Sequence, residues 1–487
     1  MRNKKSYKIL SAALAAALCL SVAACREPTA PGGSSWTYRG ENVMDHLGPE
    51  TGEISFMVGG GSVELQLWDR LISAFEEANS GITVRQVNIA TADALYTMLA
   101  SGNAPDVIQV ESPDFGNWAR NGALMSVQPF IDQEKYDTSD FWPQALEMFS
   151  YDTANGIRGT VSDADTVELF SLPKDFGVNG VFVNRTLVEE AHSEGRLSDE
   201  QYALVTDQVN PMTYEEYLDV AVALTQNKGD SASMIYGSNR IYWESYLWSL
   251  GDDIVTADHH LNTKSENVRK VLEYSKAMVD PSGEYYCAPY TPSTSSSSQD
   301  EMSMFTTGRI AMFWSGRWLV PNYDAANIDY YCIPCPVAIR EDGTRGESLG
   351  WCSTVGYSIS RNCEKTQMAW KFIKFLTSEE GYRIMNELNY AVPGRMSLVT
   401  EPEFADPSTN GSKLDAASAA VFFNLAKTAR VNNSARYSSP RWIEEFEERL
   451  DLYFTGDYDS VDTLMSRAER AVNSALESSD PQLFEGE

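Results

Sequence analysis

Residues 53–110 of the chain read EISFMVGGGSVELQLWDRLISAFEEANSGITVRQVNIATADALYTMLASGNAPDVIQV. Short apolar runs, which are typical of β-strands, alternate here with longer segments whose apolar residues recur at helical spacing. The pattern predicts strands at 54–58, 82–89 and 105–110, and helices around 65–75 and 93–101. This alternation indicates an α/β fold with a parallel sheet and helices on both of its faces. Ligands bind such sheets beyond the carboxyl ends of the strands, which here means 59–62 and 111–114.

The N-terminus has the layout of a bacterial secretory signal. Four basic residues within the first eight precede an apolar run at 9–24, which is too short to span a membrane comfortably. The run ends in Val22-Ala23-Ala24-Cys25, which resembles a lipobox with Cys25 as the lipidated residue. The alternative is an ordinary cleaved signal in which Cys25 is incidental. We expect a signal peptide over 1–24, a lipid anchor on Cys25, and a protein held at the extracytoplasmic face of the bacterial cell membrane.

Composition excludes several classes of protein. The chain has 487 residues and a formal net charge of −31, so it is long enough for two domains or more and repels the phosphates of nucleic acids. Signal cleavage and lipidation leave five of the seven cysteines, which we interpret as buried residues with at most one disulfide. The four histidines form neither a zinc motif nor a plausible catalytic triad. No cofactor or metal is expected.

Several dispersed segments resemble the extracellular solute-binding proteins of the carbohydrate-binding class that serve ABC importers (family 1). The segments that carry the resemblance are AFE at 74–76, LASGNAPDV at 99–107, NGVFVNR at 179–185, MTYEEY at 212–217, GRIAMFWSGRW at 308–318 and AWKFIKFL at 369–376. They follow one another in the family's order over most of residues 53–395. Departures from the family's pattern are Tyr214 in place of the usual tryptophan and an acidic insertion at 161–169.

The resemblance implies a two-lobed periplasmic-binding-protein-like α/β fold with a hinge and a ligand cleft between the lobes. The chain would cross between lobes near 172–175, return near 334–338 and leave again near 389–393. The implied organisation is a signal peptide at 1–24, a lipidated cysteine and flexible tether at 25–50, an N-terminal lobe of 51–173 plus 337–390, and a C-terminal lobe of 174–336 plus 391–487.

A sugar site needs aromatic plates for the ring faces and acceptors for the hydroxyl groups. Tryptophans beside Gly, Ser, Pro or polar residues are the stacking candidates, namely Trp243, Trp314, Trp318, Trp351 and Trp442, with Trp243 and Trp318 the best. For each one alone, burial in the core is an equally good interpretation. The polar candidates are Glu111, Asp114, Asp175 and Arg395, of which Asp114 could instead cap a helix and Arg395 could serve the hinge.

These observations predict a monomeric substrate-binding lipoprotein that captures a carbohydrate, and more specifically an oligosaccharide, and delivers it to the permease subunits of an ABC importer. It would not be an enzyme. Three alternatives stay open at this stage: a surface-anchored glycan-active enzyme, an adhesion protein, and a binding protein for an organic solute that is not a sugar. With 69 acidic residues, the sequence alone does not exclude a catalytic carboxylate pair.

Overall fold

The computed structural model describes residues 40, 42–59, 62–89, 91–230, 232–292 and 297–485. The predicted signal peptide, Cys25 and most of the predicted tether lie outside these residues. In the part of the chain that is described, no helix is long and apolar enough to cross a membrane.

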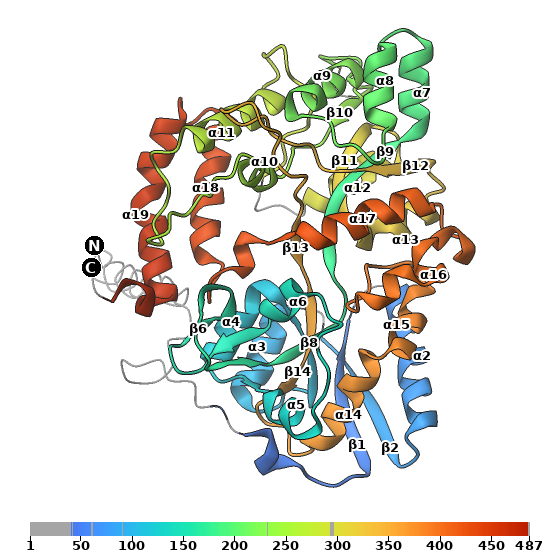
Figure 1. The fold of residues 1–487 in the computed structure, drawn as a ribbon, viewed down its shortest axis with the longest axis vertical. Helices are drawn as coiled ribbons and strands as arrows, with labels where there is room; N and C mark the ends of the chain where they lie inside the picture. The colour runs from blue at the N-terminus through green and yellow to red at the C-terminus, as the bar shows by residue number, and fades with distance from the viewer. Residues whose placement is uncertain are drawn as a thin grey trace, which may run out of the picture. The chain divides into compact units, whose positions relative to one another are not determined.

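The first sheet contains the strands predicted from residues 53–110, and it lies in the lower half of Figure 1. Its order is β2-β1-β3-β14-β4, with β8 also paired to β14. The strands are β1 (Gly52–Val58), β2 (Ile82–Asn88), β3 (Val107–Glu111), β4 (Leu124–Met125), β8 (Ser171–Pro173) and β14 (Val355–Ser360). β1 is parallel to β2 and β3, as predicted, whereas β14 is antiparallel to β3, β4 and β8. The sheet is therefore mixed, because β14 belongs to a chain segment that returns from the second sheet.

Local sequence accounts for the helices around this sheet. The predicted helices are α2 (Ser62–Ala78) and α3 (Ala92–Ser101), and α3 ends at Gly102 in the left-handed conformation that glycine adopts without strain. The third, α4 (Ser112–Arg120), begins directly after β3. Two further α-helices follow α4 before the chain enters the second sheet, namely α5 (Gln128–Glu134) and α6 (Pro143–Glu147). After them, β5 (Ser150–Asp152), β6 (Ile157–Arg158) and β7 (Val167–Leu169) form a small separate sheet.

The second sheet has the order β10-β11-β9-β13-β15, with β12 also paired to β9. Its strands are β9 (Gly177–Asn184), β10 (Tyr236–Ser238), β11 (Ile310–Gly316), β12 (Tyr330–Ile333), β13 (Trp351–Ser353) and β15 (Arg430–Val431). The other helices are α7 (Arg185–Ser193), α8 (Asp199–Thr206), α9 (Tyr214–Leu224), α10 (Trp243–Ser249), α11 (Glu266–Val279), α12 (Ser297–Thr306), α13 (Val320–Ala325), α14 (Thr366–Leu376), α15 (Glu379–Asn386), α16 (Pro402–Ala405), α17 (Ala416–Thr428), α18 (Arg441–Thr455) and α19 (Val461–Ser479). We call the parts built on the two sheets the first lobe and the second lobe.

The chain passes between the sheets near the predicted first crossing, since β8 ends at Pro173 and β9 begins at Gly177. The return differs from the predicted 334–338, because Val337 pairs with Thr213 and β13 pairs with β9 in the second sheet. The chain returns only at Thr354, between β13 and β14.

Beyond the predicted boundary at 390–391, the chain contacts both cores before it joins the second lobe for good. Val392 pairs with Phe176, but Leu398 and Phe404 still pack in the first core. Residues of α17, such as Phe422, belong to the second core. We therefore propose that residues 337–353 belong to the second lobe, and that the final passage into it falls between α16 and α17.

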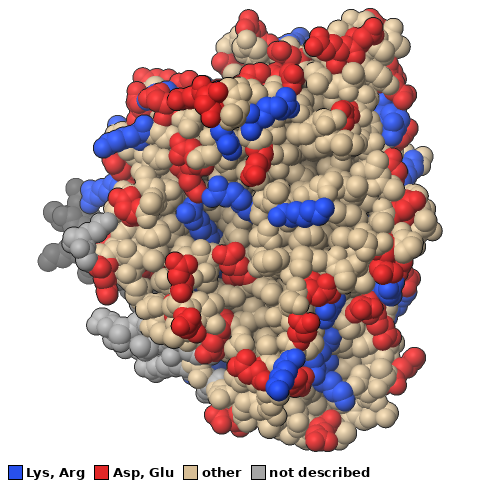
Figure 2. Space-filling model, in the orientation of Figure 1, with Lys and Arg blue, Asp and Glu red and all other residues tan. Residues whose placement is uncertain are grey.

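Each lobe has its own hydrophobic core. The first is centred on aromatic side chains such as Phe56, Trp68 and Phe372, and the second on a larger set around Phe182 and Trp314. All five cysteines within the described residues are buried and free, so the predicted burial is confirmed and no disulfide forms among them. On the face shown in Figure 2, acidic side chains are scattered over both lobes, as suits a soluble exterior.

Candidate functional site

A cavity of about 360 Å³ opens in the second lobe, where β11 ends and β13 and α10 begin. We call it the second-lobe cavity. Its lining residues are Asn239, Arg240, Ile241, Tyr242, Trp243, Glu244, Thr291, Glu301, Met302, Phe313, Trp314, Ser315, Trp318, Leu319, Trp351, Asn432 and Glu447. Four of the five predicted stacking tryptophans are therefore brought together in one place.

Two of these tryptophans present partly exposed rings to the cavity. Trp318 and Trp351 lie with their ring centroids 5.9 Å apart and their planes at 31°, and Tyr242 meets Trp351 edge-on at 5.2 Å. The glycine of the Gly-Arg-Trp segment has a steric role, because a Cβ on Gly316 would lie only 1.7 Å from the Trp318 ring. The local sequence thus seats the Trp318 ring against the backbone at the end of β11.

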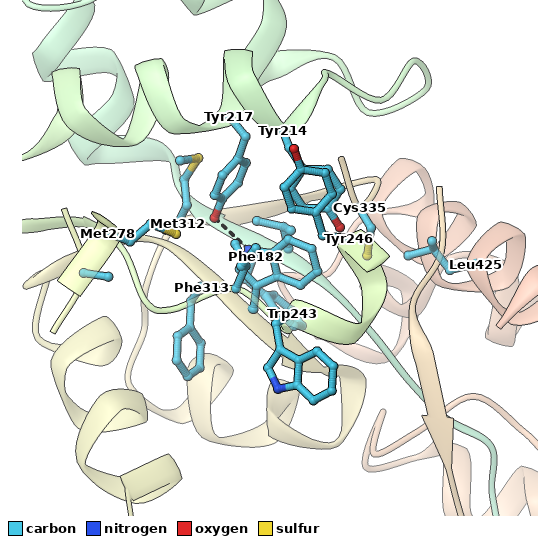
Figure 3. Close-up of a cluster of buried hydrophobic side chains, with 14 of the residues drawn as sticks. Phe182, Tyr214, Tyr217, Trp243, Tyr246, Met278, Met312, Phe313, Cys335 and Leu425 are labelled. Atoms are coloured by element: carbon cyan, nitrogen blue, oxygen red, sulfur yellow. Dashed lines mark hydrogen bonds between the residues drawn. The ribbon is translucent and has the colours of Figure 1, made fainter. Parts of the chain in front are cut away.

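The other two tryptophans that line the cavity are core residues. Trp314 is 0% exposed, and its indole Nε1–H donates to the Tyr217 hydroxyl at 2.9 Å. Trp243 is 4% exposed and packs on Phe446. Figure 3 shows Trp243 within the cluster of buried side chains that also contains Tyr217 and Phe182. Their truncation would disturb packing as well as any ligand contact.

Three glutamates and one arginine are the charged groups in this cavity. Glu301 is held in place by the Thr291 hydroxyl, which donates at 2.7 Å, and by the Asn239 amide at 3.1 Å. Burial, followed by repulsion from Glu447, raises the pKa of Glu244 to about 8. Burial also raises the pKa of Glu447 to about 7, against the opposing effect of Arg240. The cavity is therefore short of positive charge.

A second cavity of about 360 Å³ opens in the first lobe, beyond the carboxyl ends of β1 and β3. We call it the first-lobe cavity. Its lining residues are Met57, Gly59, Glu64, Trp68, Ile89, Thr91, Leu95, Gln109, Glu111, Asp114, Trp118, Lys174, Val355 and Tyr390. The predicted acceptors Glu111 and Asp114 both lie here, at the edge of the sheet that the strand pattern indicated.

The first-lobe cavity combines carboxylates with a buried lysine. Burial, then repulsion from Glu111 and Glu444, raises the pKa of Asp114 to about 6. Asp114 lies in the first turn of α4 and is not its N-cap, which is Glu111. Lys174 is 4% exposed, and its Nζ lies 5.1 Å from the Trp68 ring centroid and 4.9 Å from that of Tyr390. The two rings stabilise the ammonium group by cation–π attraction.

Asp175 is buried beside this cavity, in a smaller one that it shares with Lys174 and Tyr390. The Thr354 hydroxyl donates to the backbone carbonyl of Asp175 at 2.6 Å and lies 3.3 Å from its carboxylate. Burial raises the pKa of this carboxylate, and the neighbouring Lys174 opposes the rise. Asp175 thus links the first crossing of the chain to the return crossing at Thr354.

Two segments of the chain connect the two cavities. Trp351 lines the second-lobe cavity and Val355 the first-lobe cavity, and they are four residues apart on the extended run from β13 to β14. Helix α18 also reaches both, since Glu447 lines the second-lobe cavity while the charge of Glu444 acts on Asp114 in the first-lobe cavity.

Two predicted ligand residues lie elsewhere. Trp442 is 0% exposed and packs edge-on against Tyr437 at 5.5 Å. The Arg395 guanidinium donates to the Thr377 carbonyl and the Tyr136 hydroxyl, each at 2.8 Å, and pairs with Asp140. Neither residue lines the two cavities, so a ligand contact by either stays a prediction.

Sequence reasoning did not single out Arg240, Glu244, Glu301, Glu447 or Lys174, although all five line the cavities. Glu244 follows Trp243 in the sequence and Lys174 precedes Asp175, and both Trp243 and Asp175 were predicted site residues. Their position next to a predicted residue was therefore the signal that could have identified Glu244 and Lys174. Glu447 lies among the acidic residues of α18, where nothing in the sequence distinguishes it from its neighbours. No group of three or more His, Cys, Asp or Glu side chains placed to hold a metal ion is found in the described ranges.

Two α/β lobes that are joined by several crossings, each with a cavity lined by aromatic and carboxylate side chains, define a two-lobed solute-binding protein. The chain belongs to the bacterial extracellular solute-binding protein family, whose sequence model matches residues 70–410. The predicted family and fold are confirmed. This is a family of binding proteins and not of enzymes, and its members act outside the cytoplasm.

Solved structures with the same fold are distant in sequence. An ABC substrate-binding protein of Listeria monocytogenes, in complex with cycloalternan, aligns with a TM-score of 0.68 at 18% identity over 88% of this chain and 99% of that one. An ABC transporter solute-binding protein of Thermotoga lettingae, bound to α-D-tagatose, gives 0.67 at 19% identity over 88% and 100%. The sugar-binding protein MalE of Xanthomonas citri gives 0.66 at 19% identity over 90% and 100%.

Proposed function

We propose that the protein captures a carbohydrate in the cleft between its lobes and delivers it to the permease of an ABC importer. The observation that carries this proposal is the pair of partly exposed rings, Trp318 and Trp351, set beside carboxylates that accept hydrogen bonds. The rings offer apolar plates to sugar faces, while Glu301 and the opposing Glu111 offer acceptors to hydroxyl groups. Two cavities of similar size favour an oligosaccharide over a single sugar.

The proposed mechanism is closure of the lobes around the ligand. A sugar stacked on Trp318 contacts Glu111 and Asp114 only when the first-lobe cavity approaches, so its binding free energy favours the closed arrangement. The crossings at 173–177 and at Thr354 are the segments about which the lobes would move. The permease would then recognise the closed form.

We also propose that the mature protein begins at a lipidated Cys25 and acts as a monomer tethered to the extracytoplasmic face of the membrane. The basic start, the apolar run and the lipobox-like residues support this proposal. Metabolic labelling with a palmitate analogue tests it. The wild-type chain should be labelled and Cys25→Ala should not, whereas equal labelling of both would contradict a lipid on Cys25.

A thermal-shift screen against mono- and oligosaccharides tests the carbohydrate proposal, because a ligand that binds only the native state raises the melting temperature. We expect a saturable shift with at least one oligosaccharide, and no products when the mixture is analysed by chromatography. Release of shorter sugars would favour the glycan-active enzyme. A shift with no sugar, but with another organic solute, would contradict a carbohydrate ligand.

A further inference from the structure

Within the described residues, one carboxylate of the second-lobe cavity receives no hydrogen bond from another residue. Glu244 is 7% exposed and lines the cavity, yet its carboxylate receives only its own backbone N–H. A buried ionised carboxylate without donors or a counter-charge is costly, so such a group is normally paired. Glu301 in the same cavity shows the contrast, because Thr291 and Asn239 occupy both of its oxygens.

The positive charge near Glu244 comes from Arg240, which lowers the pKa of Glu244 by less than burial and Glu447 raise it. The Arg240 guanidinium lies over the Phe454 ring, 4.7 Å from its centroid, and forms no ion pair with any described residue. Glu447, from α18, adds a second negative charge. Asp253 adds a third from the segment after α10, but it is paired at 3.0 Å with Arg430 and with Arg436. Among the residues that line the cavity, Arg240 is the positive charge, and Glu244, Glu301 and Glu447 are the three acidic groups.

We propose that the second-lobe cavity binds a protonated amine, and that the captured carbohydrate carries an ammonium group that lies beside Glu244 and Glu447. This inference rests on the proposed function and names the class of its ligand, an amino sugar or its oligomer. An ammonium group supplies both the hydrogen-bond donors that Glu244 lacks and the charge that the cavity lacks. Trp318 and Trp351 border the same space and offer the faces on which an adjoining sugar ring would stack.

Proton release on binding follows from the same arrangement. With a pKa of about 8, Glu244 is mostly protonated at pH 7 in the empty cavity, and Glu447, with a pKa of about 7, is half protonated. A cation beside them favours the ionised carboxylates, so binding releases protons to the buffer. A neutral sugar has no such effect. The number of protons released therefore separates binding of an amine from plain stacking.

Calorimetric titration with matched probes tests the inference. The probes are glucosamine and its β-1,4-linked trimer, compared with glucose and cellotriose, which carry a hydroxyl in place of each ammonium group. We expect the amine probes to bind about tenfold more tightly or better at pH 7. We also expect the heat to vary with the ionisation enthalpy of the buffer, which reports proton release, for the amine probes only.

Two variants complete the test. Glu244→Gln keeps the shape of the side chain but removes its charge, and should abolish the preference for the amine probes. Glu448→Gln is the matched control, because Glu448 lies on α18 next to Glu447 but is about half exposed and faces Arg441. It should change nothing.

The outcomes distinguish this inference from the proposed function. Tighter binding of the amine probes that depends on Glu244 supports both. Binding of the neutral probes, or of any neutral sugar in the thermal-shift panel, with no preference for the amines overturns the ammonium subsite and leaves carbohydrate capture intact. Absence of binding by every sugar, neutral or amine, overturns both. A preference for amines that survives in Glu244→Gln would overturn the assignment to this cavity.

Discussion

The two cavities of the cleft have similar volumes but different chemistry. The second-lobe cavity offers the partly exposed rings of Trp318 and Trp351 together with a pocket around Glu244 that is short of positive charge. The first-lobe cavity has two tryptophans, Trp68 and Trp118, but they are only 1% and 3% exposed, and the Trp68 ring supports the ammonium group of Lys174. The second lobe is thus suited to binding the apolar faces of a ligand, and the first lobe to contacting the ligand's polar groups after the lobes close.

The second-lobe cavity contains two kinds of tryptophan, buried and partly exposed, that look alike in the sequence. Trp314 and Trp318 are four residues apart and both line the second-lobe cavity. Trp314 is fully buried in the second core, whereas Trp318 is partly exposed. Stability and affinity should therefore respond to different substitutions.

The largest effect is expected from Trp314→Ala. Removal of a fully buried indole that packs on Tyr214 and Tyr217 should lower the free energy of unfolding by about 3–5 kcal/mol. Chemical denaturation monitored by circular dichroism measures this loss. A loss below about 1 kcal/mol would mean that Trp314 belongs to the cleft and not to the core.

Trp318→Ala should have the next largest effect, and on affinity instead of stability. Loss of an aromatic plate at the centre of a binding site costs about 2 kcal/mol, or about 30-fold in Kd. Calorimetric titration with the best sugar from the thermal-shift panel measures the change, and the variant should unfold at nearly the wild-type temperature. Unchanged affinity would remove the stacking role of Trp318.

The pH dependence of stability provides a third test. The pKa of Glu244 is about 8 in the folded protein, above its ordinary value of 4.5, so the native state binds a proton that the unfolded state releases. Stability should therefore fall as pH rises from about 5 to 8, by up to about 1.4 kcal/mol per pH unit for one proton. Melting curves over this range should show a shallower slope for Glu244→Gln than for wild type. Identical slopes would contradict the buried, unpaired state of Glu244.

The smallest effect on affinity is expected from Arg395→Ala. Its guanidinium is bonded to Thr377, Tyr136 and Asp140, so the variant should lose about 1–2 kcal/mol of stability and bind sugar within about twofold of wild type. Denaturation and titration of the same sample measure both quantities. A tenfold loss of affinity with normal stability would instead support the contact with ligand that the sequence predicted.

Much of the fold could be predicted because the spacing of apolar residues within short segments determines where helices and strands form. The period of Trp68, Leu71 and Phe75 predicted α2, and the strand ends led directly to Glu111 and Asp114. The crossing at Thr354 could not be predicted in this way. Extended segments such as 337–353 carry no local signal that says which sheet they will join, because pairing depends on partners far away in the chain.

The candidate site shows the same limit. Glycine and polar neighbours marked Trp318 and Trp351 as loop residues, but they marked Trp442 equally well, and only packing against Tyr437 distinguishes it. The charge of Glu244 and Glu447 gave no signal either, since burial and not residue type makes these two acids unusual. Burial is a property of the whole fold.

The central claim is that one sugar contacts both lobes at once. The most direct test compares the affinity of the best sugar for Trp318→Ala, in the second-lobe cavity, with that for Asp114→Asn, in the first-lobe cavity. Calorimetric titration should show weaker binding in both variants, by about 30-fold and by about fivefold or more. Full affinity in Asp114→Asn, together with loss in Trp318→Ala, would contradict capture between the lobes and confine the ligand to the second lobe.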